Sequence, residues 1–320
     1  RVDTLLALPH VDDEVYAALT AAAPKWKGQA LAAWLTGCRA ADRADVNREQ
    51  LAAAHLNNKD WRVRAAAIEL ARAAPSKTLI SPLIDRLKRE KGRLQADSLS
   101  ALREITGASF ATARDWQAWW KGAQDTFEIP RNPRSRRDGR TASPTSASYW
   151  EMPVVSERVT FVVDTSGSML KPFSTGDTSR LEEAQAQLSK VFDALPKGAK
   201  VNVISFAADA ARMFEDLSTL SARRRKAART FIEELESKGP TNLYAALQRA
   251  FEQEEVDTIF VLTDGRPSSG SVADPGRVRR WAQLWNAGRS IRIHTIALGD
   301  ESELLEQLAA DSGGVYRVAK

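Results

Sequence analysis

The sequence predicts two different folds in one chain: an all-α solenoid first, then an α/β doubly wound domain with a mostly parallel sheet. Three observations lead to this division. Residues 1–125 carry apolar side chains at helical spacing, with prolines and glycines between the segments. Residues 151–320 alternate short apolar β-rich runs with helical segments. Residues 126–150 are rich in proline, serine, threonine and arginine, which is typical of a linker.

Helical spacing continues through most of the first part of the chain. The expected helical segments are Trp26–Cys38, Val46–Leu56, Trp61–Ala74, Leu79–Leu87, Leu94–Ile105 and Trp116–Trp120. Two of them share an apolar pattern at an offset of 31 residues, so that Val63 corresponds to Leu94 and Ile68 to Leu99. Such a period is typical of stacked helical hairpins that bury their apolar faces against their neighbours. The region is similar to a short HEAT-type solenoid, where an arginine followed by small residues, here Arg64, is typical of a second helix.

The basic residues of the chain are spread thinly. The formal net charge is +5, with 19 basic against 15 acidic residues in 1–125 and 22 of each in 158–320. Five arginines lie within Arg131–Arg140 of the linker. They could bind phosphate groups, but we expect a solvated, extended connector. This distribution gives little support to a nucleic-acid partner.

The second part alternates strands and helices. The expected strands are Val159–Val163, Val201–Phe206, Thr258–Leu262, Ile291–Leu298 and Val315–Val318. The expected helices are Leu181–Leu195, Ala222–Leu235, Leu243–Phe251, Val278–Asn286 and Leu304–Ala310. Continuous apolar strands are buried on both faces, which predicts a parallel sheet covered by helices, a Rossmann-like arrangement. Ala211–Glu215 follows its preceding strand too closely for a crossover helix, so we expect it to pair antiparallel at an edge.

Three separate segments place side-chain oxygens at strand ends or at a helix start. The first strand runs into Asp164, and Ser166 and Ser168 follow at every second position. A Gly-Pro turn places Thr241 before a helix, and another buried strand ends in Asp264. Ligands bind at the carboxyl ends of the strands in such sheets. Carboxylate and hydroxyl oxygens suit Mg2+ or Mn2+, whereas the lack of Cys and His in these three segments argues against Zn2+.

These segments resemble, position by position, the metal-ion-dependent adhesion site of von Willebrand factor A domains. The Asp-x-Ser-x-Ser pattern of that family falls on Asp164, Ser166 and Ser168, its loop threonine on Thr241 and its later aspartate on Asp264. The resemblance implies that the hydroxyls contact the metal directly and that the carboxylates act directly or through water. It implies Mg2+, with Mn2+ or Ca2+ as alternatives, and a protein partner that supplies an Asp or Glu carboxylate.

Two loops beside this site, Lys171–Arg180 and Pro267–Pro275, are expected to select the partner, although they could also be plain connections. Loops held by a rigid scaffold commonly carry specificity. The predicted partner-binding rim consists of Lys171, Phe173, Asn242, Arg266 and Ser268.

We expect a non-enzymatic, metal-dependent protein-binding module, adhesive or scaffolding, with a second protein surface on the solenoid. The sequence contains no evident nucleophile–base pair. No apolar run reaches the roughly 18 residues that a bilayer requires. The overall pairing resembles bacterial proteins with HEAT-type repeats and a von Willebrand A domain, many of which are exported. This resemblance, together with a start at Arg1 rather than Met, favours a trimmed precursor and an extracytoplasmic location.

Two alternative functions stay open. The Ro ribonucleoprotein family also joins HEAT-type repeats to this domain, which would imply RNA binding, but residues 1–125 are few for the Ro ring of repeats. In metal chelatases a von Willebrand A domain docks on an AAA+ ATPase, so the chain could be a regulatory subunit acting on such a partner in trans. Salt-dependent RNA binding would indicate the first alternative, and an ATPase that co-purifies would indicate the second.

Overall fold

The computed structural model describes residues 11–41, 46–130, 147–174 and 177–320. Contacts within the chain divide it into two compact units, residues 1–143 with 287–290 and residues 144–286 with 291–320.

The first unit is built from helices. Those that the structure describes are α2 (Asp13–Ala22), α3 (Gly28–Ala40), α4 (Arg48–His55), α5 (Trp61–Ala73), α6 (Ile80–Arg89), α7 (Gly92–Thr106) and α8 (Ala113–Ala123), with short 3-10 turns at Ala23–Lys25 and Lys77–Leu79. Several begin at a polar side chain that accepts a backbone hydrogen bond. Asp12 accepts from Val15 N at 2.8 Å, and Asn47 accepts from Gln50 N at 2.9 Å. These caps satisfy amide groups that the first helical turn leaves without a partner.

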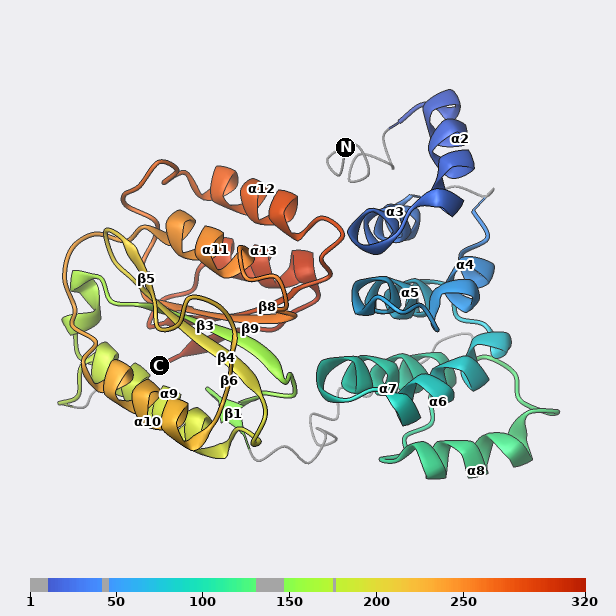
Figure 1. The fold of residues 1–320 in the computed structure, drawn as a ribbon, viewed down its shortest axis with the longest axis horizontal. Coiled ribbons are helices and arrows are strands. Elements are labelled where there is room, and N and C mark those ends of the chain that lie inside the picture. The colour runs from blue at the N-terminus through green and yellow to red at the C-terminus, as the bar shows by residue number, and fades with distance from the viewer. Residues whose placement is uncertain (1–10, 42–45, 131–146, 175–176) are drawn as a thin grey trace. The chain divides into compact units, whose positions relative to one another are not determined.

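The helices of this unit stack in sequence order. α3 packs on α5 and α5 on α7, while α4 lies against α5 and α6 against α7 (Figure 1). Arg72 of α5 binds Glu104 of α7 through two hydrogen bonds of 2.8 and 2.7 Å. At the end of the stack, Trp116 is fully buried and Trp120 is 7% exposed. The predicted all-α fold is confirmed for residues 13–123, and the assignment to HEAT-type repeats stays a prediction.

The second unit contains a mostly parallel sheet. Its strands are β3 (Arg158–Asp164), β4 (Lys200–Phe206), β5 (Ala210–Arg212), β6 (Ser218–Thr219), β7 (Thr258–Thr263), β8 (Arg292–Leu298) and β9 (Tyr316–Ala319). Their order is β5-β4-β3-β7-β8-β9, and β6 also pairs with β4. β5 and β6 are antiparallel to β4, and the other pairs are parallel. Both the doubly wound fold and the antiparallel edge are therefore confirmed.

Helices cover both faces of the sheet (Figure 1). One face carries α9 (Arg180–Ala194) and α10 (Ala222–Glu233). The other carries α11 (Leu243–Phe251), α12 (Pro275–Asn286) and α13 (Glu303–Ser312). Each face has its own apolar cluster, because side chains alternate across every strand. Phe161 and Phe260, for example, stack at 5.5 Å on the α9 side.

The described ends of the predicted linker pack on the two units. Phe127 and Ile129 lie against the core of the helical unit. A two-stranded hairpin, β1 (Ser148–Tyr149) with β2 (Met152–Pro153), belongs to the sheet unit, where Tyr149 is fully buried. The arginines of 131–140 lie outside the described residues. The division into residues 1–125, 126–150 and 151–320 stays a prediction.

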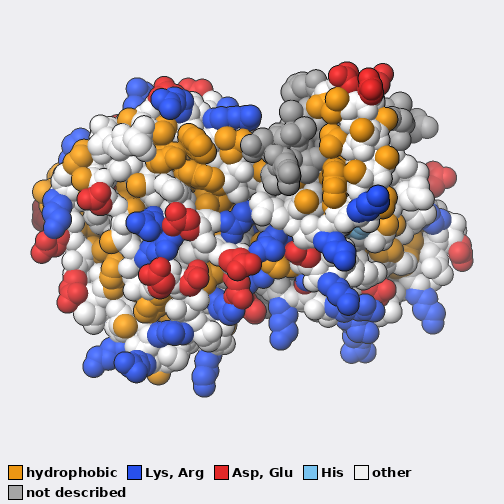
Figure 2. All heavy atoms as spheres, turned by 45° about the horizontal axis from the view of Figure 1, so that its top comes forward, with side chains coloured by type: hydrophobic (Ala, Val, Ile, Leu, Met, Phe, Trp, Pro, Cys, Tyr) orange, Lys and Arg blue, Asp and Glu red, His pale blue; other side chains and the backbone are white. Residues whose placement is uncertain are grey.

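The surface mixes charges of both signs. On the face drawn in Figure 2, basic and acidic side chains are interspersed rather than gathered by sign. A few large apolar side chains in the described ranges are exposed. The most exposed of them is Leu170, in the short helix η4 (Gly167–Leu170), with 65% of its surface accessible. Within those ranges, no helix combines the length and apolar character needed to cross a membrane.

Candidate metal centre

Two strands bring the predicted aspartates to the same edge of the sheet. β3 and β7 are parallel neighbours, with Val163 opposite Leu262. β3 ends at Asp164, and Asp264 follows the last residue of β7. Both strands are buried along almost their whole length, which fixes their register and therefore the place where each carboxylate leaves the sheet.

The loop that carries the two serines is tied to the loop that carries Thr241. Gly167 N donates to Gly239 O at 2.9 Å, and Lys238 N donates to Thr165 O at 2.8 Å. Gly239 has a φ of +77°, a conformation that favours glycine. These contacts hold the threonine loop beside the Asp-x-Ser-x-Ser loop, although the two are far apart in the sequence.

Four of the predicted residues place side-chain oxygens close together. Ser168 Oγ donates to Asp264 Oδ1 at 2.6 Å, and Ser166 Oγ lies 3.1 Å from Ser168 Oγ. A Cβ atom built on Gly265 would lie 3.6 Å from Thr241 Oγ1 and 3.8 Å from Ser168 Oγ. The threonine and serine hydroxyls therefore face the same small volume.

Asp164 is a buried carboxylate at the base of this group. It is fully buried, and one of its oxygens accepts a hydrogen bond from Ser166 N at 2.7 Å. The other accepts a hydrogen bond from the Thr263 hydroxyl. Burial raises the pKa of Asp164 to about 6, against the lowering effect of these hydrogen bonds, and the negative charge of Asp264 adds to the rise. In the described part of the chain, no cation pairs with Asp164.

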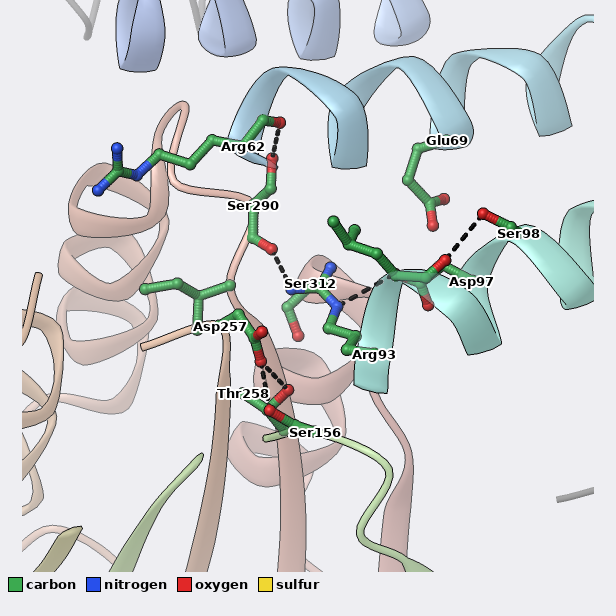
Figure 3. Close-up of polar contacts among 12 residues, drawn as sticks. Arg62, Glu69, Arg93, Asp97, Ser98, Ser156, Asp257, Thr258, Ser290 and Ser312 are labelled. Carbon is green, nitrogen blue, oxygen red and sulfur yellow. Dashed lines mark hydrogen bonds and ion pairs between the residues drawn. The ribbon is translucent and has the colours of Figure 1, made fainter. Parts of the chain in front are cut away.

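Asp257, a second buried aspartate at the other end of the sheet, is a useful comparison because its charge is neutralised by an arginine. Asp257 precedes β7 and is 3% exposed. It accepts hydrogen bonds from Ser156 Oγ at 2.6 Å and from Thr258 Oγ1 at 2.8 Å (Figure 3). Arg158 also binds it, with Nη2 at 2.9 Å. Asp257 thus has an arginine as its counter-ion, whereas Asp164 has hydrogen-bond donors but no counter-ion in the described ranges.

The donor set fits a hard divalent cation. It consists of two carboxylates and three hydroxyls: Asp164, Ser166, Ser168, Thr241 and Asp264. Among the described residues, no group of three or more His, Cys, Asp and Glu side chains could hold a metal. A cation here would therefore depend on hydroxyl oxygens as well as carboxylates, which suits Mg2+ or Mn2+.

Three of the predicted rim residues reach the surface. Lys171, Arg266 and Ser268 are exposed. Ser268 also has a structural contact, since its Oγ accepts a hydrogen bond from Thr241 N at 2.9 Å. Arg266 lines a cavity of about 530 Å³ that includes Asp264 and Gly265 among its walls. Of the five predicted ligands, Asp264 alone is among the residues that line this cavity.

The side chains of the other two predicted rim residues make contacts within the fold. Phe173 is half-buried, and its ring packs edge-on against Trp150 at 5.4 Å. Asn242 is 8% exposed and caps α11 by accepting from Ala245 N at 3.1 Å. Its amide donates to Ala208 O at 2.9 Å. Phe173 and Asn242 are therefore less exposed than Lys171, Arg266 and Ser268, and the partner-binding rim stays a prediction.

Two further side chains belong to the site and were not singled out from the sequence. Thr263 donates to Asp164, and Arg180 Nη1 lies 2.5 Å from Asp264 Oδ2. Thr263 is the last residue of β7, so its place next to Asp264 was a usable signal. Arg180 ends the predicted specificity loop Lys171–Arg180, but its contact crosses to a strand end far along the chain.

Comparison with known proteins identifies the family of the sheet unit. Residues 157–318 match the model of the von Willebrand factor type A domain. The chain therefore belongs to this family.

Several curated proteins are similar to the same part of the chain. Human von Willebrand factor A domain-containing protein 3A is 26% identical over 167 residues, which cover 51% of this chain and 13% of that protein. Human inter-alpha-trypsin inhibitor heavy chain H4 is 29% identical over 175 residues, covering 50% and 18%. Heavy chain H3 of Pongo abelii is 27% identical over 181 residues, covering 52% and 20%. The chain thus spans only 13–20% of these relatives.

A solved structure is similar to about half of the chain. A von Willebrand factor type A protein from Catenulispora acidiphila aligns with a TM-score of 0.46 and 22% identity, covering 52% of this chain and 39% of that chain.

Proposed function

We propose that this chain is a divalent-metal-dependent protein-binding module of the adhesive or scaffolding kind, and not an enzyme. Its metal ligands would be Asp164, Ser166, Ser168, Thr241 and Asp264. The observation that carries the proposal is the full burial of Asp164 without a counter-ion among the described residues, beside three hydroxyls. Membership in the von Willebrand factor type A family supports a role in protein interaction.

The residues of the site have distinct parts in this function. Asp164 supplies a negative charge whose orientation is fixed by Ser166 N and by the Thr263 hydroxyl. The hydroxyls of Ser166, Ser168 and Thr241 add neutral oxygen ligands and leave the charge of the site low. A bound Mg2+ or Mn2+, or Ca2+, would supply an electrophilic centre that accepts an oxygen of an Asp or Glu side chain from the partner.

Two exposed basic side chains near the site favour an acidic partner, while the cavity that Arg266 lines also contains Asp300, Glu301 and Glu303. Lys171 and Arg266 are exposed beside the site and carry positive charge toward solvent. Such charges raise the rate at which a negatively charged surface meets the site. Exposed Leu170 provides apolar contact area at the same edge. We propose that the helical unit offers a second protein surface, as HEAT-type solenoids do.

We expect Thr241→Ala to weaken metal binding by about tenfold, in the range seen when groups around a metal are removed. Thr241 is 5% exposed and its hydroxyl faces the other oxygens of the site. Thr241→Ser is the matched control, because it removes only the methyl group and keeps the oxygen. Isothermal titration with Mn2+ measures both variants. Equal affinities for the alanine and serine variants would show that Thr241 is not a ligand.

The proposed capture of a carboxylate is tested on the partner. We expect a crosslinking pulldown to recover a protein in Mg2+ that is lost in chelator. Each exposed Asp or Glu of its footprint is then changed to Asn or Gln. One such change should remove most of the binding, and the residual binding should no longer respond to chelator. If every change leaves the Mg2+-dependent affinity intact, the partner does not bind through a carboxylate.

A further inference from the structure

Hydrogen bonds fix the backbone around Arg180. It is the first residue of α9, and the capping residue Ser179 accepts from Glu182 N at 3.2 Å while Glu182 accepts from Ser179 N at 2.6 Å. Arg180 N also donates to Lys171 O at 2.9 Å. The backbone from which this side chain leaves is therefore fixed by three hydrogen bonds, and its direction is set by the start of the helix.

The guanidinium of Arg180 sits in a slot formed by a glycine. Gly299 follows β8 and has a φ of +92°. A Cβ atom at this position would lie 2.7 Å from Arg180 Nη2 and 3.3 Å from Cζ. Gly299 N donates to Ala319 O at 2.9 Å, which fixes the peptide that forms the wall. A larger residue at 299 would therefore displace the guanidinium as well as strain the backbone.

In this slot Arg180 occupies one oxygen of Asp264. Arg180 Nη1 lies 2.5 Å from Asp264 Oδ2, while Ser168 Oγ donates to Asp264 Oδ1 at 2.6 Å. The Asp264 side chain is fully buried and that of Arg180 is 17% exposed, so water screens this pair little. Of the two carboxylates at this edge, Asp264 thus has an arginine as counter-ion, and Asp164 has none among the described residues.

We propose that Arg180 is a positioning residue that neutralises Asp264 and so makes the metal site a stronger receptor for carboxylates. This inference rests on the proposed function. Without Arg180, the two aspartates would balance the charge of a dication. With Arg180, one positive charge is left in excess. The excess charge weakens the hold of the protein on its metal and strengthens the attraction for an incoming carboxylate.

The opposite signs of these two effects make the test specific. The full chain is loaded with Mn2+, whose affinity is measured by the paramagnetic resonance signal of the free ion. Acetate is the carboxylate probe, and water-proton relaxation reports how many exchangeable waters it displaces. We expect Arg180→Gln to bind Mn2+ on the order of tenfold more tightly than the wild type. We also expect the variant to require several-fold more acetate to displace the same water.

Two further variants control the experiment. Arg279→Gln breaks an ion pair with Asp311 of similar geometry, 2.7 Å from Nε to Oδ2, on the surface between α12 and α13. Its Mn2+ and acetate affinities should equal those of the wild type. Arg180→Met keeps the length and apolar stem of the side chain, and it takes the place of Arg180→Gln if that variant does not fold. Circular dichroism in chelator establishes the fold of each chain.

The outcomes separate this inference from the proposed function. If the wild type binds Mn2+ and Asp164→Ala does not, the metal site stands. If in that case the neutral variants at position 180 bind Mn2+ no more tightly than the wild type, or bind acetate equally well, Arg180 has only a structural role. If the wild type itself does not bind Mn2+, the proposed function fails and this inference fails with it.

Discussion

Saturating Mg2+ should raise the unfolding temperature of the sheet unit by roughly 5 to 10 °C, and chelator should remove the increase. A ligand that binds only the folded state adds RT ln(1 + [L]/Kd), which is about 2.7 kcal/mol at a hundredfold excess over Kd. The measurement is calorimetry of the full chain, where the transition of the helical unit serves as an internal reference. The unit should fold without the metal, because its two apolar clusters contain none of the five proposed ligands.

Two variants test whether the effect arises at the proposed site. Asp164→Ala should abolish the response to Mg2+, because it removes the buried charge at the base of the donor set. Asp193→Asn removes an acidic residue near the other end of α9, where Asp193 is paired with Arg229, and should leave the response unchanged. An undiminished Mg2+ response in Asp164→Ala would refute the assignment of the metal to this edge.

The placement of the two aspartates could be predicted because several sequence signals agree. The segments before Asp164 and Asp264 are continuous apolar runs, which predict buried parallel strands, and such strands end at a common edge. The adhesion-site pattern then names the residues. The antiparallel β5 was also predictable, because the connection from β4 is too short for a crossover helix.

The contacts around these residues could not be predicted in the same way. Arg180 binds Asp264 because Gly299, at the end of another strand, leaves room for a guanidinium. A sequence pattern predicts neither the rotamer of Arg180 nor the space that Gly299 leaves beside it. The hairpin of β1 and β2 has strands of two residues each, too short for any periodicity, and it lies partly in a segment whose composition predicts a linker.

Two of the predicted rim residues, Asn242 and Phe173, make contacts within the fold. Asn242 follows Thr241 and directly precedes the helix Leu243–Phe251. Asparagine in that position is a strong signal for a helix cap, and the structure shows this capping bond. Phe173 lies in a loop beside the site, but its ring packs on Trp150 because apolar area is stabilised by burial.

The second large effect concerns the metal-free protein, which should become more stable when Asp164 is replaced by asparagine. Burial raises the pKa of Asp164 to about 6 from an ordinary value of 3.8. Well below pH 3.8 the folded and unfolded chains both carry the proton at this residue. As the pH rises from 4 through 6, the unfolded chain loses the proton first, so the unfolding free energy falls. The difference amounts to about 3 kcal/mol at pH 7.

Asparagine can keep the hydrogen bonds of Asp164 without its charge. Its oxygen can accept from Ser166 N, and its amide can donate to the Thr263 hydroxyl, which then donates to Gly265 O at 3.3 Å. In chelator at pH 7, we therefore expect Asp164→Asn to unfold at higher urea concentration than the wild type, by up to about 3 kcal/mol. Most of this difference should vanish at pH 4, where Asp164 is protonated in the folded chain.

The order of stability should reverse when the metal is added. Saturating Mg2+ should stabilise the wild type and leave Asp164→Asn almost unchanged, because the amide oxygen brings no negative charge to the site. Urea unfolding of both chains at pH 4 and pH 7, with chelator and with Mg2+, measures the four differences. If Asp164→Asn is less stable than the wild type in chelator at pH 7, the buried carboxylate is stabilised by the fold itself, and it needs no cation. That result would remove the main support for a metal at this edge of the sheet.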